Sequence, residues 1–288
     1  MRIVAIASLI LLLPSTAVAV EPAAHARTAS SVVRVVAKLS TPGSTSFGTG
    51  VVLPDGRIAT NCHVIPGDQR VAVLEGGASV AVERAEGDLA ADLCMLRGSG
   101  FAAPPARLGD ARTLKIGDEV VAIGFGAGAA RGISVGRVTG LYTYRNSRVI
   151  QTTAAFRQGA SGGGLFDAAG NLVGITTFFR RGPSSTAFYA IPVDWIEGLP
   201  LSPVIGQPQT PPFWTGPNAG QPLFLQVNAF EADGKWSEME AAARLWTQEE
   251  PAAFQSWEAL GRALNAKGEL LEGSNAMERA RQAAESHH

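Results

Sequence analysis

Three side chains that lie far apart in the sequence have the types needed for nucleophilic catalysis. A serine hydroxyl is a weak nucleophile at neutral pH, so it needs a base to take its proton and a third group to orient that base. Ser161 lies in the glycine-rich stretch QGASGGGL, and His63 is the only histidine between residues 30 and 204. His63 is therefore the candidate base. A purely structural histidine is the alternative.

The candidate acid lies in the stretch DLAADLCML, between the histidine and the serine. Asp92 opens the apolar run 93–96, which is typical of a strand that enters a core. A carboxylate at the mouth of such a strand can accept a hydrogen bond from an imidazole and fix its tautomer. Asp88 is the alternative, but it lies farther out in a turn. We predict Asp92 as the orienting acid.

Gly159, two residues before the serine, suits the remaining requirement of acyl transfer. An oxyanion is stabilised best by backbone N–H groups that converge on one point, and glycine permits the unusual backbone conformation that this needs. We predict that the N–H groups of Gly159 and Ser161 form an oxyanion hole. Glycine-serine runs are also common in flexible linkers, so an ordinary loop remains the alternative.

The segments that would position these residues are short and rich in Val, Ile and Thr. From about residue 30 to 204, apolar runs of strand length alternate with turns such as PDG and AGN. Many short strands at regular spacing favour an all-β barrel or sandwich. The 33 glycines agree with a turn-rich β body. We place this domain at residues 28–204.

The sequence changes character after this β-rich region. Residues 205–222 are rich in proline and predict an extended linker, or a strap that lies on the first domain. Residues 223–288 predict amphipathic helices. Within them, WEALGRAL (residues 257–264) resembles the tetratricopeptide signature W-x-x-L-G-x-x-Y; a generic helical hairpin is the alternative. These helices could bind a protein partner or stabilise the fold, and the sequence leaves both alternatives open.

The N-terminus predicts export. Arg2 is followed by an apolar run and by the small-residue site Ala17-Val18-Ala19, so residues 1–19 are typical of a secretory signal peptide. The run is too short to span a bilayer comfortably, although an N-terminal anchor is the alternative. We expect a periplasmic or secreted protein with no stable membrane anchor after cleavage. The net charge of −1 gives no reason to expect nucleic acid or an anionic membrane as a partner.

Several motifs, in order, resemble the trypsin-like serine proteases of the HtrA/Deg type. The order His63, Asp92, Ser161 is the chymotrypsin order. The matching stretches are GTGVVLPDGRIATNCHVI, DLAADLCML, IQTTAAFRQGASGGGLFDAAGNLVGITT and AFYAIPVDWI. The resemblance implies two six-stranded β-barrels with the triad between them, Gly159 in the oxyanion hole, and protein or peptide substrates. A serine endopeptidase of this kind needs no metal or organic cofactor.

The chain departs from the family at three places. Ala160 stands where the family usually has Asn or Asp, and Gly164 stands where it usually has Pro. We expect the extra glycine to loosen the turn around the nucleophile. The PDZ domains that often follow the protease domain are replaced by the tetratricopeptide-like helices, which puts the family's usual regulation and assembly in doubt.

Substrate preference follows from the residues that the resemblance places around the first specificity pocket. Its floor is expected near Ala155, and Thr176, Thr177 and Tyr189 are expected to line its walls. No acidic residue lies there. We therefore predict cleavage after small or medium apolar residues.

The two cysteines of the chain flank the predicted base and acid. Cys62 precedes His63, and Cys94 follows Asp92 by two residues. If the imidazole meets the carboxylate, the two thiols come close, and in an oxidising compartment a disulfide would clamp the two segments together. Two buried, unlinked thiols are the alternative.

Two other function classes remain open beside a serine endopeptidase. A catalytically silent, protease-like scaffold could bind partners through its helical C-terminal segment. A serine esterase is less consistent, because the serine lies in G-A-S-G-G rather than in a G-x-S-x-G elbow and the body is β-rich.

Overall fold

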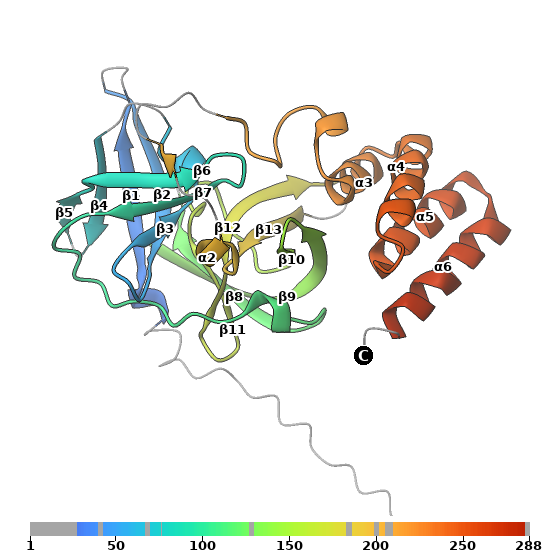
Figure 1. Cartoon of the computed structure of the whole chain (residues 1–288), viewed down its shortest axis with the longest axis horizontal. Coiled ribbons are helices and arrows are strands. Elements are labelled where there is room, and N and C mark those ends of the chain that lie inside the picture. The colour runs from blue at the N-terminus through green and yellow to red at the C-terminus, as the bar shows by residue number, and fades with distance from the viewer. Residues whose placement is uncertain are drawn as a thin grey trace, which may run out of the picture.

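The computed structural model shows a strand-rich body followed by helices (Figure 1). It describes residues 28–39, 43–66, 70–75, 77–126, 130–182, 186–198, 202–204 and 210–285. The predicted signal peptide lies outside the described residues. The described helices include none that is long and apolar enough to cross a membrane.

The first half of the body is an eight-stranded antiparallel sheet. Its order is β14-β6-β7-β3-β2-β1-β4-β5. The strands are β1 (Val32–Lys38), β2 (Thr45–Val52), β3 (Ile58–Thr60), β4 (Arg70–Glu75), β5 (Ala78–Ala81), β6 (Arg84–Asp88), β7 (Leu93–Arg97) and β14 (Ser202–Pro203). Two closed barrels were expected, but over the described residues this sheet is open and forms a half-barrel. Its edges are the short strands β5 and β14, and β14 comes from the end of the body.

The second half is a closed, six-stranded barrel in the order β10-β13-β12-β11-β8-β9. The strands are β8 (Glu119–Phe125), β9 (Arg131–Tyr144), β10 (Ser147–Thr152), β11 (Gly164–Asp167), β12 (Leu172–Arg181) and β13 (Thr186–Pro192). The short helix α2 (Trp195–Gly198) follows, with Trp195 fully buried. The prediction of a β-rich body followed by C-terminal helices is confirmed.

The proline-rich segment packs against the body in its described part, residues 210–222, as a strap does. Phe213 is buried, and its N–H donates to the carbonyl oxygen of Ala90 at 2.9 Å. The segment then makes the single turn η3 (Asn218–Gly220) and enters the first long helix. In Figure 1 its described part leads into α3.

Four helices complete the described chain: α3 (Leu223–Ala232), α4 (Trp236–Glu249), α5 (Phe254–Lys267) and α6 (Leu270–Glu285). Gly268 ends α5 with a φ of +86°, a conformation that glycine adopts without strain. A Cβ on Gly261 would lie 2.6 Å from the sulfur of Met277, so this glycine lets α5 and α6 approach closely. The helical hairpin is present, and its assignment as a tetratricopeptide repeat stays a prediction.

Aromatic packing and hydrogen bonds hold these helices on the second barrel. Phe224 of α3 stacks on Tyr142 of β9, with ring centroids 4.6 Å apart and planes 7° from parallel. The side-chain amide of Gln255 on α5 donates to the carbonyl oxygen of Leu141 at 2.9 Å. The helices therefore share an apolar core with the barrel.

Phe224→Ala tests whether the helices and the barrel form one unit. The substitution removes a ring that is 2% exposed, so we expect it to lower the free energy of unfolding by about 3–5 kcal/mol. Leu271→Ala is the control, because Leu271 is 81% exposed on α6 and should change that free energy by no more than about 0.5 kcal/mol. Urea unfolding followed by circular dichroism measures both, and equal small effects would contradict the shared core.

Candidate active site

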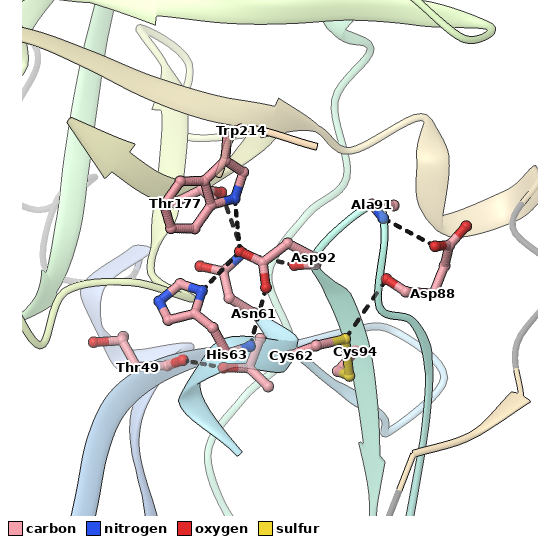
Figure 2. Close-up of a disulfide and its surroundings, with 11 residues drawn as sticks. Thr49, Asn61, Cys62, His63, Asp88, Ala91, Asp92, Cys94, Thr177 and Trp214 are labelled. Carbon is pink, nitrogen blue, oxygen red and sulfur yellow. Dashed lines mark hydrogen bonds and ion pairs between the residues drawn. A yellow bond between two sulfur atoms is a disulfide. The ribbon is translucent and has the colours of Figure 1, made fainter. Parts of the chain in front are cut away.

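The predicted base and acid meet at the junction of β3 and β7. His63 Nδ1 lies 2.7 Å from Asp92 Oδ2, and the His63 backbone N–H donates to Asp92 Oδ1 at 3.0 Å. The Asp92 side chain is fully buried, whereas that of His63 is 33% exposed. A carboxylate on Nδ1 leaves Nε2 as the nitrogen free to accept a proton. Figure 2 shows the pair.

Local backbone structure aims the carboxylate at the imidazole. His63 lies in the 3-10 turn η1 (Cys62–Val64), directly after β3. Asp92 has a φ of +58°, a left-handed conformation that is uncommon for residues other than glycine. The Asn61 side-chain amide donates to the Asp92 carbonyl oxygen at 2.8 Å and so holds this turn. Local strain at Asp92 is thus stabilised by contacts with the histidine segment.

The alternative acid, Asp88, has other partners. Its carboxylate accepts a hydrogen bond from the N–H of Ala91 at 2.9 Å and binds the guanidinium of Arg145 at 2.7 Å. These contacts cap the turn before Asp92. Asp88 therefore supports the acid segment and makes no contact with His63 in the described structure.

Ser161 belongs to the same site through a short chain of hydrogen bonds. Its hydroxyl donates to the carbonyl oxygen of Thr177 at 3.0 Å. The hydroxyl of Thr177 accepts from the side-chain amide of Asn61 at 3.2 Å, and the same amide contacts the Asp92 carbonyl oxygen.

The described residues contain no cluster of His, Cys, Asp and Glu of the kind that holds a metal ion.

The residues before the serine form a tight turn. The N–H of Ala160 donates to the carbonyl oxygen of Arg157 at 2.9 Å, and Gly159 has a φ of +93°. These two features define a type II turn, which requires a positive φ at its third residue. A Cβ on Gly159 would lie 3.0 Å from backbone atoms of Phe125 and Gly126. The N–H groups of Gly159 and Ser161 donate to none of the described residues.

Thr49 of β2 fixes this turn from the other half of the body. It is fully buried, and its hydroxyl donates to the Gly159 carbonyl oxygen and accepts from the Phe125 N–H, both at 2.9 Å. Its own N–H donates to the Ser161 carbonyl oxygen at 2.9 Å. Thr49 thus holds the peptide between Gly159 and Ala160 through its side chain, and the peptide after Ser161 through its backbone N–H. Sequence reasoning did not single out this threonine.

The expectation that Gly164 loosens the nucleophile turn is wrong. Gly164 begins β11 and is buried, and a Cβ there would lie 2.3 Å from the ring of Phe166. The ring occupies the space that a larger residue would need. The Ala160 carbonyl oxygen accepts from the Thr176 hydroxyl at 2.8 Å and from the Gly163 N–H at 3.0 Å. Hydrogen bonds to the backbone carbonyl of Ala160 therefore hold the turn, because the Ala160 side chain is apolar and cannot do so.

Three of the four predicted pocket residues are almost fully buried in the described structure. Thr176, Thr177 and Tyr189 are 1%, 2% and 0% exposed. The register of β12 shifts between Thr176 and Phe178, and such an irregularity turns successive side chains inward. The Tyr189 hydroxyl accepts from Gln151 and from Asn228 of α3, and burial raises its pKa. Ala155 is exposed, and its N–H donates to the Ser134 hydroxyl.

Three aromatic side chains that sequence reasoning missed gather beside Ala155. The Phe156 ring lies 5.1 Å from that of Phe188 and 6.3 Å from that of Phe179, and all three are partly buried. Phe156 leads into the nucleophile turn, and Phe179 lies on β12, two residues after Thr177, whose carbonyl oxygen contacts Ser161. The adjacent phenylalanines at 178 and 179 were the only signal in the sequence.

The expected Cys62–Cys94 disulfide is present, with Cα atoms 5.0 Å apart (Figure 2). It joins η1 to β7, next to His63 and Asp92. A Cβ on Gly87, which pairs with Cys94 across β6 and β7, would lie 2.5 Å from the sulfur of Cys94. Glycine at this position therefore leaves room for the disulfide.

A residue of the strap also reaches the site. Trp214 Nε1 donates to Asp92 Oδ2 at 3.0 Å, and its ring meets that of His63 edge to face at 5.5 Å. The contact joins residues 122 positions apart. No local pattern in the sequence indicated it.

Residues 48–175 match the trypsin-like peptidase domain family. This part of the chain is similar to serine proteases of the DegP/HtrA type. A probable periplasmic serine endoprotease DegP-like of Pseudomonas savastanoi is 36% identical over 157 residues, which cover 52% of this chain. The putative serine protease HhoA of Synechocystis is 31% identical over 164 residues, which cover 53% of this chain and 41% of that relative. The match spans 33% of the length of the DegP-like relative.

Solved structures of proteases are also similar to this chain. The HtrA-type protease AlgW with a tripeptide is 30% identical, with a TM-score of 0.53, and the match covers 60% of this chain and 59% of AlgW. A protease of M. tuberculosis in its active form gives a TM-score of 0.57, covering 68% of this chain and 92% of that one. At 22% identity the second match supports the fold alone.

Removing the disulfide of the peptidase domain should lower stability. The bond closes a loop with a sequence separation of 32, for which chain entropy predicts a stabilisation of about 3–4 kcal/mol. We expect Cys62→Ala combined with Cys94→Ala to lower the free energy of urea unfolding by about that amount. Dithiothreitol should lower the wild-type midpoint and leave that of the double variant unchanged. A wild-type midpoint that is insensitive to the reductant would contradict the bond.

Proposed function

We propose that the protein is an exported serine endopeptidase that hydrolyses peptide bonds of proteins, with His63, Asp92 and Ser161 as its triad. The observation that carries the proposal is the buried Asp92 carboxylate on His63 Nδ1, at 2.7 Å, in a peptidase domain whose Ser161 lies in a glycine turn. The names of the relatives, which are serine endoproteases, support it. The reaction as proposed uses side chains and backbone groups and needs no cofactor.

The proposed chemistry begins with the proton of Ser161. Its hydroxyl rests on the Thr177 carbonyl oxygen and would rotate toward His63 Nε2 when a substrate binds, since catalytic hydrogen bonds often form only in the complex. His63 then takes the proton as Ser161 Oγ attacks the scissile carbonyl. Asp92 holds the imidazole in the tautomer that leaves Nε2 free, and it stabilises the imidazolium that forms.

The developing oxyanion would be held by the N–H groups of Gly159 and Ser161. Both are free of hydrogen bonds to the described residues, so they lose no partner when an oxyanion arrives. The type II turn fixes the plane of the peptide before Gly159, and Thr49 fixes the plane after it. Such preorganised donors stabilise a transition state without reorganisation.

The aromatic side chains of Phe156, Phe179 and Phe188 support a preference for small or medium apolar residues at the cleaved bond. They gather between Ala155 and β12, next to the nucleophile turn. Rings there leave little depth for a long side chain, and no carboxylate lies among them to bind Lys or Arg. The proposed pocket keeps the expected floor at Ala155 and has these rings as its walls.

Export and the helical segment complete the proposal. The sequence of residues 1–19 supports a signal peptide, and a DegP-like relative is named periplasmic. We place the mature protein in the periplasm or outside the cell. The helices α3–α6 stabilise the body through Phe224 and Gln255. We also propose that these helices bind a protein partner, which a pull-down with the immobilised chain would test.

Cleavage of a peptide library by the mature chain, beside its Ser161→Ala variant, tests the proposal. We expect the wild type to cleave after small or medium apolar residues, and the loss of the nucleophile to reduce turnover by at least about 10⁴-fold. A fluorophosphonate should label the wild type at Ser161 and leave the variant unlabelled. An unlabelled, inactive wild type would instead support the catalytically silent scaffold, and turnover of esters without peptides would support an esterase.

Thr49→Val tests how the oxyanion hole is held. The substitution keeps the shape of the side chain but removes the contacts to the Gly159 carbonyl and the Phe125 N–H. We expect kcat to fall by about tenfold or more, with KM nearly unchanged, because the loss frees the turn that holds the proposed oxyanion donors, which act in the transition state. Thr139→Val is the matched control, since its hydroxyl donates to Gln151 Oε1 at 3.3 Å in an exposed position. Equal kcat values in the two variants would overturn this role of Thr49.

A further inference from the structure

The strap residue Trp214 contacts both partners of the His63–Asp92 pair. Its indole N–H donates to Asp92 Oδ2 at 3.0 Å, the same oxygen that lies 2.7 Å from His63 Nδ1. With the His63 backbone N–H on Oδ1, three donors hold one fully buried carboxylate in the described structure. In Figure 2 the indole lies beside the carboxylate, and its nitrogen points at it.

Each donor on a buried carboxylate matters, because a buried charge is costly unless hydrogen bonds replace the lost water. Hydrogen bonds to a charged group are also shorter and stronger than neutral ones. The two histidine donors fix the distance between the carboxylate and the imidazole. Trp214 approaches Oδ2 from a separate segment, and so restricts rotation of the carboxylate about its own bond.

Several contacts hold the indole in place from the C-terminal side. The ring stacks on Phe178, with centroids 4.8 Å apart and planes 10° from parallel, and Phe178 stacks on Tyr189 at 4.6 Å. The Tyr189 hydroxyl accepts from Asn228 of α3 at 2.9 Å. This stack connects the first helix of the C-terminal segment to the carboxylate.

The strap backbone is fastened on both sides of Trp214. The guanidinium of Arg180 on β12 donates to the Trp214 carbonyl oxygen at 3.2 Å and to that of Leu225 at 3.3 Å, and it also binds the side chain of Gln221. On the other side, the Phe213 N–H donates to the Ala90 carbonyl oxygen, two residues before Asp92. The strap therefore joins β12 to the turn that carries the acid.

We propose that Trp214 is a positioning residue for the catalytic pair, and that the triad reaches full activity only when the strap and α3 are docked on the body. This inference rests on the proposed endopeptidase function. It makes the C-terminal segment part of the machinery of the peptidase domain. It also predicts that any change that undocks the strap lowers turnover without touching Ser161.

Trp214→Phe in the full mature chain separates the hydrogen bond from the packing. Phenylalanine keeps an aromatic ring on Phe178 but has no N–H for Asp92. We expect kcat on the library-selected peptide to fall by about 10- to 100-fold, the range for one hydrogen bond to a charged group, with KM within about twofold. Trp257→Phe is the matched control. Trp257 lies on α5, and the substitution removes its indole hydrogen bond of 2.8 Å to the Pro251 carbonyl oxygen.

A second measurement is independent of turnover. The chain has five tryptophans, so ¹⁵N-tryptophan labelling gives five indole N–H signals by NMR. In Asp92→Asn the Trp214 signal should move upfield, because its acceptor loses its charge, while the other four stay in place. Selective loss of that signal in Trp214→Phe assigns it.

The outcomes separate this inference from the proposed function. Wild-type kcat and KM in Trp214→Phe, or five unmoved indole signals in Asp92→Asn, would overturn the positioning role while the endopeptidase stands. A wild type that is no more active than Ser161→Ala would overturn the proposed function, and with it the catalytic part of this inference. The indole signals would then still decide whether Trp214 binds Asp92.

Discussion

The buried carboxylate of Asp92 is the constraint on which the arrangement of the site depends. A charge with no exposed surface must be surrounded by donors, and these come from two separate segments: η1, through the ring and the backbone N–H of His63, and the strap, through Trp214. Asn61, directly before η1, also donates to the backbone carbonyl of Asp92. The disulfide ties the first of these segments to β7. The left-handed backbone of Asp92 is tolerated because these contacts together hold the residue in one position.

The nucleophile turn is held differently, by neutral groups from both halves of the body. Thr49 of the first sheet and Thr176 of the second barrel bind the carbonyl oxygens of Gly159 and Ala160. Close packing also restricts the glycines, since a Cβ on Gly162 would lie 2.0 Å from the Thr49 carbonyl oxygen. The two halves of the body therefore cannot slide past each other without disturbing the turn that carries Ser161. Substitutions away from the family pattern at Ala160 and Gly164 are accommodated by this packing.

Sequence reasoning was most successful where the signal is local. The strands, the meeting of His63 with Asp92 and the pairing of the two cysteines all follow from short stretches. It failed where the contact is remote or where the register changes. Trp214 reaches Asp92 across 122 residues of chain, and the irregularity in β12 turns Thr176 and Thr177 inward together. A strand pattern with a strict period of two cannot indicate either feature.

A crystal structure of the mature chain after reaction with a fluorophosphonate tests the central claim most directly. The account predicts phosphorus bonded to Ser161 Oγ and a phosphonyl oxygen about 2.7–3.1 Å from the backbone nitrogens of both Gly159 and Ser161. It also predicts that His63 Nδ1 remains on the Asp92 carboxylate. An adduct on another residue, or a phosphonyl oxygen that lies away from these two N–H groups, would contradict it.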